Sequence, residues 1–315
     1  MREPYIGLMS GTSLDGIDAA LVDLSTTPPA VHSAVTRPYP ADVRSQLTAL
    51  SQGTAANEVD LLGRMDSLLG DLFAETALNL LDTAGLKAHE IRAIGSHGQT
   101  IRHRPDGPYP FTLQIGDPNI IAARTGITTV ADFRRRDLAL GGQGAPLMPA
   151  FHAACFRTPD QERAVLNLGG MANLTLLPAD TREPVRGFDT GPGNVLMDAW
   201  IGRQLDKSHD PQGEWGASGK VLPALLERML RENYFELTPP KSTGRELFHL
   251  GWLEQQLRNE AFKPADVQAT LCELTAVSVA SALKRWAPRT QRLLVCGGGT
   301  HNSALMDRLR THLPA

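Results

Sequence analysis

The chain opens with an apolar strand, a turn of glycine and hydroxyl residues, and a second apolar strand, and this order most constrains its fold. The segment runs from Tyr5 to Leu24 and reads YIGLMSGTSLDGIDAALVDL. Its second half carries small and branched residues that suit a sheet, so the pattern predicts a β-hairpin and not a strand followed by a helix. The same order recurs in RAVLNLGGMANLTLLPA, with a glycine pair at the turn. This coarse echo indicates a second, related half.

The length of the chain also favours two domains. Its 315 residues exceed the length, roughly 250 to 300 residues, at which one hydrophobic core usually stops growing. The segment GGQGAPLMP, from Gly141 to Pro149, is rich in glycine and proline, which predicts a loop close to the domain boundary. We expect an N-terminal domain over residues 1–135 and a C-terminal domain over residues 136–315.

Charge and cysteine content exclude several classes of protein. A formal net charge of -3 provides no basic field for a nucleic-acid backbone. The first apolar stretch is too short and too interrupted by glycine for a signal peptide, and no later run approaches a membrane span. The chain has three widely spaced cysteines, Cys155, Cys272 and Cys296, which support neither a disulfide framework nor a zinc site. We expect a cytoplasmic protein without nucleic-acid or membrane partners.

The turn GTSLDGID is a candidate phosphate-binding loop. Its backbone amides and hydroxyls can hold phosphate while an aspartate faces the accompanying metal ion. A solvated hairpin turn uses the same residue types, so the loop alone does not decide between the two roles. The candidate nucleotide-binding residues of this loop are Gly11, Thr12, Ser13, Leu14, Asp15, Gly16, Ile17 and Asp18.

Asp189 is the candidate general base. It lies in FDTGPGN, at the end of a predicted strand and before a glycine and proline turn that opens a helix. A carboxylate at such a position can accept a proton. A role as helix N-cap is disfavoured, because the helix begins several residues later.

Three consecutive glycines near the end of the sequence are a second candidate contact with a nucleotide. Gly297, Gly298 and Gly299 have no side chains, so a flat ring or a phosphate can approach their backbone. The pattern is not GxGxxG, which disfavours a nicotinamide cofactor. Upstream, His97 and His103 lack the helical spacing of metal ligands, so hydrogen bonding to a sugar or to the backbone is favoured.

Six longer segments match a known family in order and in detail, and they extend from residue 5 to residue 302. They are YIGLMSGTSLDGIDAALVDL, SHGQTIRHRP, LQIGDPNIIAARTGITTVADFRRRDLALGGQGAPLMP, LNLGGMANLT, GFDTGPGNVLMDAW and VCGGGTHN. Together they resemble the anhydro-N-acetylmuramic acid kinase family. The resemblance implies an α/β fold of two actin-like, ribonuclease H-like halves, each with a mixed sheet and flanking helices, and an ATP cleft between them.

The resemblance also implies an ATP-dependent reaction. Water would open the anhydro ring of 1,6-anhydro-N-acetylmuramic acid at C1, and O6 would take the γ-phosphoryl group, giving N-acetylmuramic acid 6-phosphate in peptidoglycan recycling. Asp189 would deprotonate the water. Mg²⁺ would neutralise the phosphates, facing either Asp15 or Asp18, of which we prefer Asp15.

Further site residues follow from the resemblance alone. Gly169 and Gly170 join the candidate nucleotide-binding residues, and the triple glycine would lie near the adenosine. The candidate sugar-binding residues are His97, Gln99, Asp132 and Arg134.

The resemblance is incomplete at two places. Actin-like ATPases commonly carry an aspartate just before the first phosphate turn, where this chain has Met9 and Ser10. Family members also continue into another helix that brings a glutamate to the sugar, so we expect the C-terminal domain to lack its final helix. Two alternatives stay open: a non-catalytic nucleotide- or sugar-binding protein of the same fold, and a conventional hexose kinase. As the candidate assembly of the chain we consider a homodimer.

Overall fold

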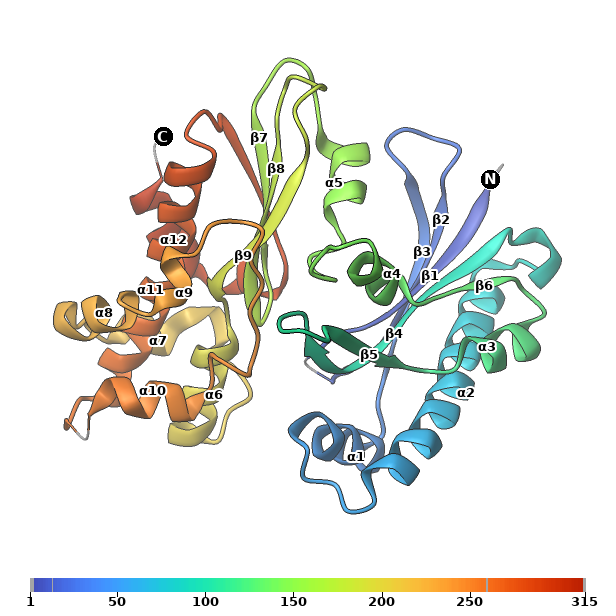
Figure 1. Ribbon diagram of the computed structural model, residues 1–315, viewed down its shortest axis with the longest axis horizontal. Coiled ribbons are helices and arrows are strands. Elements are labelled where there is room, and N and C mark those ends of the chain that lie inside the picture. The colour runs from blue at the N-terminus through green and yellow to red at the C-terminus, as the bar shows by residue number, and fades with distance from the viewer. Residues whose placement is uncertain (1–2, 13, 259, 314–315) are drawn as a thin grey trace. The chain divides into compact units, whose positions relative to one another are not determined.

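The computed structural model describes residues 3–12, 14–258 and 260–313, which form two compact units that divide between Gly144 and Ala145 (Figure 1). Each unit has its own sheet and its own hydrophobic core. The division lies in the glycine-rich segment GGQGAPLMP. The boundary expected between residues 135 and 136 falls inside a helix, α4 (Phe133–Ala139).

The first unit is built on a mixed sheet with the strand order β3-β2-β1-β4-β5, and β6 pairs with β4. The strands are β1 (Pro4–Ser10), β2 (Gly16–Asp23), β3 (Ala30–Pro38), β4 (Ala93–Arg104), β5 (Phe111–Ile115) and β6 (Thr129–Val130). β1 and β2 are antiparallel, with Met9 opposite Asp18, which confirms the predicted hairpin. β3 is antiparallel to β2, and β4 is parallel to β1.

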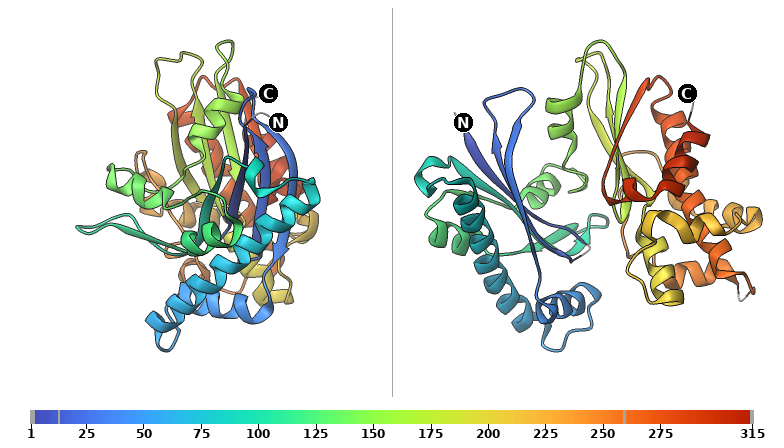
Figure 2. Two further views of the ribbon diagram at one scale, coloured as in Figure 1. Left: turned by 90° about the vertical axis from the view of Figure 1, so that its right-hand side faces the viewer. Right: turned by 180° about the vertical axis from the view of Figure 1, so that it is seen from behind.

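Helix α2 (Glu58–Ala84) lies along one face of this sheet (Figures 1 and 2). Its buried apolar side chains recur at helical spacing, so one face of the helix packs on the strands. These side chains are Leu61, Met65, Leu69, Leu72, Phe73, Ala77, Leu80 and Leu81. The other helices of the unit are α1 (Ala41–Gln52), η1 (Ala88–Glu90), α3 (Pro118–Thr125) and α4.

The sheet of the second unit has the order β10-β7-β8-β9. Its strands are β7 (Arg163–Leu168), β8 (Met171–Leu177), β9 (Arg186–Pro192) and β10 (Arg292–Cys296). β7, β8 and β9 are successively antiparallel, whereas β10 is parallel to β7. The order and directions repeat those of β4, β1, β2 and β3, so the echo in the sequence reflects a repeated topology. The predicted fold class, an α/β chain of two actin-like halves, is confirmed.

Helix α11 (Pro264–Trp286) packs on the second sheet, and α12 (Ser303–His312) packs on α11 (Figure 2). Leu305 and Leu309 of α12 are buried in the same core as Leu271 and Val279 of α11. The remaining helices are α5 (Pro149–Phe156), α6 (Val195–Leu205), η2 (Pro211–Gly213), α7 (Glu214–Ser218), α8 (Pro223–Leu230), α9 (Asn233–Glu236), α10 (Leu250–Leu257) and η3 (Gly298–His301).

Candidate active site

The predicted phosphate loop connects β1 to β2 and is folded back on the core. Leu14 is buried with a positive φ of 59°, and its N–H donates to the carbonyl of Gly11 at 3.3 Å. Gly16 is required by packing, because a Cβ there would lie 2.2 Å from the carbonyl oxygen of Arg37. Ile17 is fully buried, so its side chain belongs to the core. Thr12 is exposed, and Ser13 lies outside the described residues.

The two aspartates of the loop region are both accessible. The Asp15 carboxylate is 71% exposed and lies 3.6 Å from the guanidinium of Arg44. The Asp18 carboxylate, on the exposed side of β2, accepts a hydrogen bond from the Thr36 hydroxyl at 2.6 Å. Over the described ranges, no three His, Cys, Asp or Glu side chains gather into a set that could hold a metal ion.

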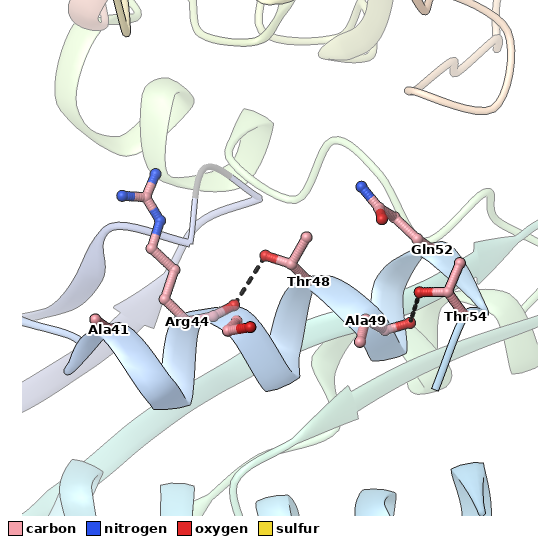
Figure 3. A pocket seen from close by; sticks show the side chains of 7 residues that line it. Ala41, Arg44, Thr48, Ala49, Gln52 and Thr54 are labelled. Atoms are coloured by element: carbon pink, nitrogen blue, oxygen red, sulfur yellow. Dashed lines mark hydrogen bonds between the residues drawn. The ribbon is translucent and has the colours of Figure 1, made fainter. Parts of the chain in front are cut away.

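A hollow of about 470 Å³ in the first unit lies along α1 beside Arg44 (Figure 3). Arg44, Thr48 and Gln52 project from one side of the helix there. The Thr48 hydroxyl donates to the Arg44 carbonyl at 2.8 Å. The lining of this hollow contains none of the predicted site residues.

The structure brings together two of the four predicted sugar-binding residues, His97 and Arg134. Arg134 Nε donates to His97 Nε2 at 2.8 Å, and His97 Nδ1 lies 2.8 Å from the carbonyl oxygen of Gly98. Since Nε2 accepts, Nδ1 carries the proton and donates. Burial, with the positive charge of Arg134, lowers the pKa of His97 to about 4. The imidazole is therefore neutral near pH 7.

Gln99 and Asp132 do not join His97 and Arg134. The pairing of β1 with β4 shifts register between Leu8 and Ser10, where β4 has one extra residue. This bulge turns the fully buried Gln99 to the face opposite His97, and its amide nitrogen donates to the Gly11 carbonyl at 3.1 Å. The Asp132 carboxylate instead accepts from Arg135 at 3.2 Å.

Asp189 is buried in the middle of β9, and its predicted position at the end of a strand is wrong. The strand continues to Pro192 because Gly191 and Pro192 still pair with β8, across a bulge between Ala172 and Asn173. Bulges commonly lie beside active sites, where they redirect a side chain.

Three groups from distant parts of the second unit hold Asp189. Its carboxylate Oδ2 accepts from the Thr243 N–H at 3.0 Å, and its own N–H donates to the Lys241 carbonyl at 3.0 Å. The Tyr234 hydroxyl donates to the Asp189 carbonyl at 2.8 Å. Burial, with the charge of Asp189, raises the pKa of Tyr234, and burial lowers that of Lys241. No pattern in the sequence pointed to these contacts.

The two glycine turns of the second unit each leave one glycine accessible, and in the first turn this is Gly170, where a Cβ would meet no described atom within 4 Å. The carbonyls of Gly169 and Gly170 accept from Asn194 and Gly193 at the start of α6, both at 2.9 Å. At the other turn, a Cβ on Gly297 would lie 2.6 Å from the Asn167 side chain, and Gly299 is equally crowded. A Cβ on Gly298 would meet no described atom within 4 Å. Gly298 therefore offers the open backbone surface of this turn.

No helix of the described part of the chain combines the length and apolar character needed to cross a bilayer. Solved structures resemble the chain weakly. (R)-2-hydroxyglutaryl-CoA dehydratase component A of Acidaminococcus fermentans is 12% identical with a TM-score of 0.49, over 98% of this chain and 88% of that one. ROK hexokinase from Thermus thermophilus is 16% identical with a TM-score of 0.38, over 98% and 89%. These structural similarities are too weak to indicate a function.

Sequence relatives are much closer. A protein of Xylella fastidiosa named anhydro-N-acetylmuramic acid kinase is 56% identical over 314 residues, which cover 98% of this chain and 82% of the relative. Proteins of the same name from Xanthomonas campestris and Coxiella burnetii are 54% and 53% identical, with the same coverage. The family model described as anhydro-N-acetylmuramic acid kinase matches residues 3–315. The chain is therefore a kinase and belongs to the anhydro-N-acetylmuramic acid kinase family.

Proposed function

We propose that this kinase uses ATP to phosphorylate O6 of 1,6-anhydro-N-acetylmuramic acid while water opens the anhydro ring, a step of peptidoglycan recycling. The observation that carries the proposal is the environment of Asp189. Its carboxylate is buried and oriented by the Thr243 N–H, and two further hydrogen bonds fix its backbone. A base held in this way loses little entropy when it meets a water molecule.

The proposed steps need only one side-chain base. Water attacks C1 of the sugar, and its proton goes to Asp189. The C1–O6 bond breaks and leaves its electron pair on O6, which attacks the γ-phosphorus as ADP departs. Since O6 is generated as a nucleophile by ring opening, no second base has to deprotonate it. The product is N-acetylmuramic acid 6-phosphate.

The loop between β1 and β2 fits the proposed Mg²⁺-ATP. Mg²⁺ is commonly held by one or two carboxylates together with substrate phosphates, so a single accessible aspartate is sufficient on the protein side. Asp15, 71% exposed at the loop, fits this mode best, and Asp18 is the alternative. The ion, when bound, would neutralise charge on the phosphates. Gly298 would accept the adenosine on its open backbone surface.

Sugar binding is proposed for the first unit at His97 and Arg134. The guanidinium, hydrogen-bonded to His97 and to the Gly144 carbonyl at 2.5 Å, has a fixed orientation toward a polar ligand.

Membership in a kinase family disfavours a binding protein without turnover. A hexose kinase, in which Asp189 would deprotonate a sugar hydroxyl, remains the alternative. We place the reaction in the cytoplasm because the three widely spaced cysteines do not support a disulfide framework. No finding on the described residues supports a homodimer.

The test is to incubate the protein with Mg-ATP and a panel of anhydro and free amino sugars in ¹⁸O-labelled water, and to identify products by mass spectrometry. We expect one labelled oxygen at C1 of N-acetylmuramic acid 6-phosphate and none in the phosphate ester. Label in the transferred phosphoryl group would contradict the coupled mechanism. Phosphorylation of free sugars alone would favour the hexose kinase.

A further inference from the structure

The loop from Gly11 to Asp15 is held from the core side by Tyr39 and Gln99, neither of which takes part in the proposed chemistry. We infer that these two are positioning residues, which turn the carbonyls of Gly11 and Asp15 inward so that the Thr12 N–H faces the ATP phosphates. The inference rests on the proposed function, in which this loop binds phosphate. It gives Gln99 a different role from the sugar contact expected from the sequence.

The orientation of the Gln99 side chain follows from its partners. Its nitrogen Nε2 lies 3.1 Å from the Gly11 carbonyl oxygen and 3.2 Å from that of Thr100. Both partners are acceptors, so the nitrogen must face them and Oε1 must face the other way. There, Oε1 lies 2.6 Å from the Ser10 hydroxyl. The buried amide thus fixes the direction of the Gly11 carbonyl.

The direction of that carbonyl determines where the next amide points. In a trans peptide, the carbonyl of one residue and the N–H of the next lie on opposite sides of the chain. Because the Gly11 carbonyl points inward to Gln99, the Thr12 N–H points outward. Outward-facing amides of a turn are what an anion-binding loop requires.

Tyr39 joins the two ends of the loop. Its N–H donates to the Asp15 carbonyl at 3.0 Å, and its hydroxyl donates to Ser10 Oγ at 2.9 Å. Ser10 Oγ also lies 2.7 Å from the Gly16 carbonyl oxygen. Burial raises the pKa of Tyr39 to about 12, so its hydroxyl keeps its proton near pH 7. The two ends of the loop, at Gly11 and Asp15, are therefore fixed before a ligand arrives, which lowers the entropy lost on binding.

The test compares Tyr39→Phe and Gln99→Met with the wild type. Tyr39→Phe keeps the buried ring and removes one donor, whereas Gln99→Met keeps the length of the side chain and removes the donor to Gly11. We expect each to weaken ATP binding about five- to tenfold by calorimetry, the effect of one hydrogen bond, while adenosine affinity stays within about twofold. The matched control is Thr76→Val, which removes a buried hydroxyl that donates to the Leu72 carbonyl inside α2.

Each outcome decides between a positioning role and a structural one. Thr76→Val should lower the melting temperature without changing the ratio of ATP to adenosine affinity. If Tyr39→Phe leaves that ratio unchanged in a folded protein, the inference is overturned, whatever the behaviour of Gln99→Met. If the wild type binds adenosine as tightly as ATP, the loop does not bind phosphate and the proposed function fails at that point. Sugar phosphorylation by the wild type is assayed separately.

Discussion

Replacing Asp189 with asparagine should nearly abolish turnover while leaving the protein folded and able to bind ATP. Asparagine has almost the same volume, and its carbonyl oxygen can still accept the 3.0 Å hydrogen bond from the Thr243 N–H. The bonds to the Lys241 carbonyl and from the Tyr234 hydroxyl involve only the backbone of Asp189, so they should persist. The amide cannot take a proton from water near pH 7.

The two expected energies differ enough to separate catalysis from stability. One charge-assisted hydrogen bond becomes a neutral one, which should cost about 1 kcal/mol of folding free energy. Loss of a general base lowers the rate by about 10²- to 10⁴-fold, or about 3 to 5 kcal/mol in the activation barrier. The loss of kcat should therefore be much larger than the loss of stability can explain.

The assay follows ADP release with saturating anhydro-sugar, alongside ATP binding by calorimetry and the melting temperature. Asp180→Asn is the matched control, because its carboxylate lies on the surface of the same unit and pairs with Arg182. It should keep wild-type kcat. Turnover above about one tenth of wild type in Asp189→Asn would show that the base lies elsewhere. Parallel loss of ATP binding and melting temperature would show a structural role instead.

Three further predictions concern the other predicted contacts. The pKa of His97 is lowered from 6.5 to about 4, so between these values the unfolded chain binds more protons than the folded one. The free energy of unfolding should therefore fall as the pH is lowered from about 6.5 to about 4. Melting temperatures measured over this range should fall less steeply in His97→Gln. Arg134→Lys loses the fixed donors to His97 and the Gly144 carbonyl, and should raise KM for the sugar about tenfold with KM for ATP unchanged. Gly298→Ala should fold normally but bind adenosine more weakly, whereas Gly297→Ala, at a φ of +89°, should lower the melting temperature; a Gly298→Ala protein with unchanged adenosine affinity would contradict this assignment.

Local patterns in the sequence predicted the parts of the fold that depend on near neighbours. Two apolar runs around a turn of glycine and hydroxyl residues, the second run with small and branched residues, were enough for the β1–β2 hairpin. The bulge in β4 was not predictable from alternation, which would have put His97 and Gln99 on one face of the strand. Asp189 was misplaced within its strand because glycine and proline after it usually end a strand, and only pairing with β8 keeps them in the sheet.

The sequence named candidate site residues, whose roles stay predictions, but it did not indicate the contacts that support them. Tyr39 reaches Ser10 across 29 positions, and Thr243 reaches Asp189 across 54. Neither pair shares a local pattern, because each forms only when separate elements pack together. The environment that orients a catalytic group is therefore the part least visible in a single sequence.

The pairing of β10 with β7 has a consequence for the order in which the chain folds during synthesis. Cys296 and Asn167, which face each other across this pair, are 129 positions apart, whereas Ser10 and Gln99 of the first unit are 89 apart. Every strand of the first unit has been made by residue 130, but β7 gains its parallel neighbour only after residue 296. The first unit can therefore complete its sheet while β10 is still unmade. At about 5–20 residues per second, the ribosome needs about 5 to 20 seconds after β9 has been made to complete β10, the last strand of the second sheet.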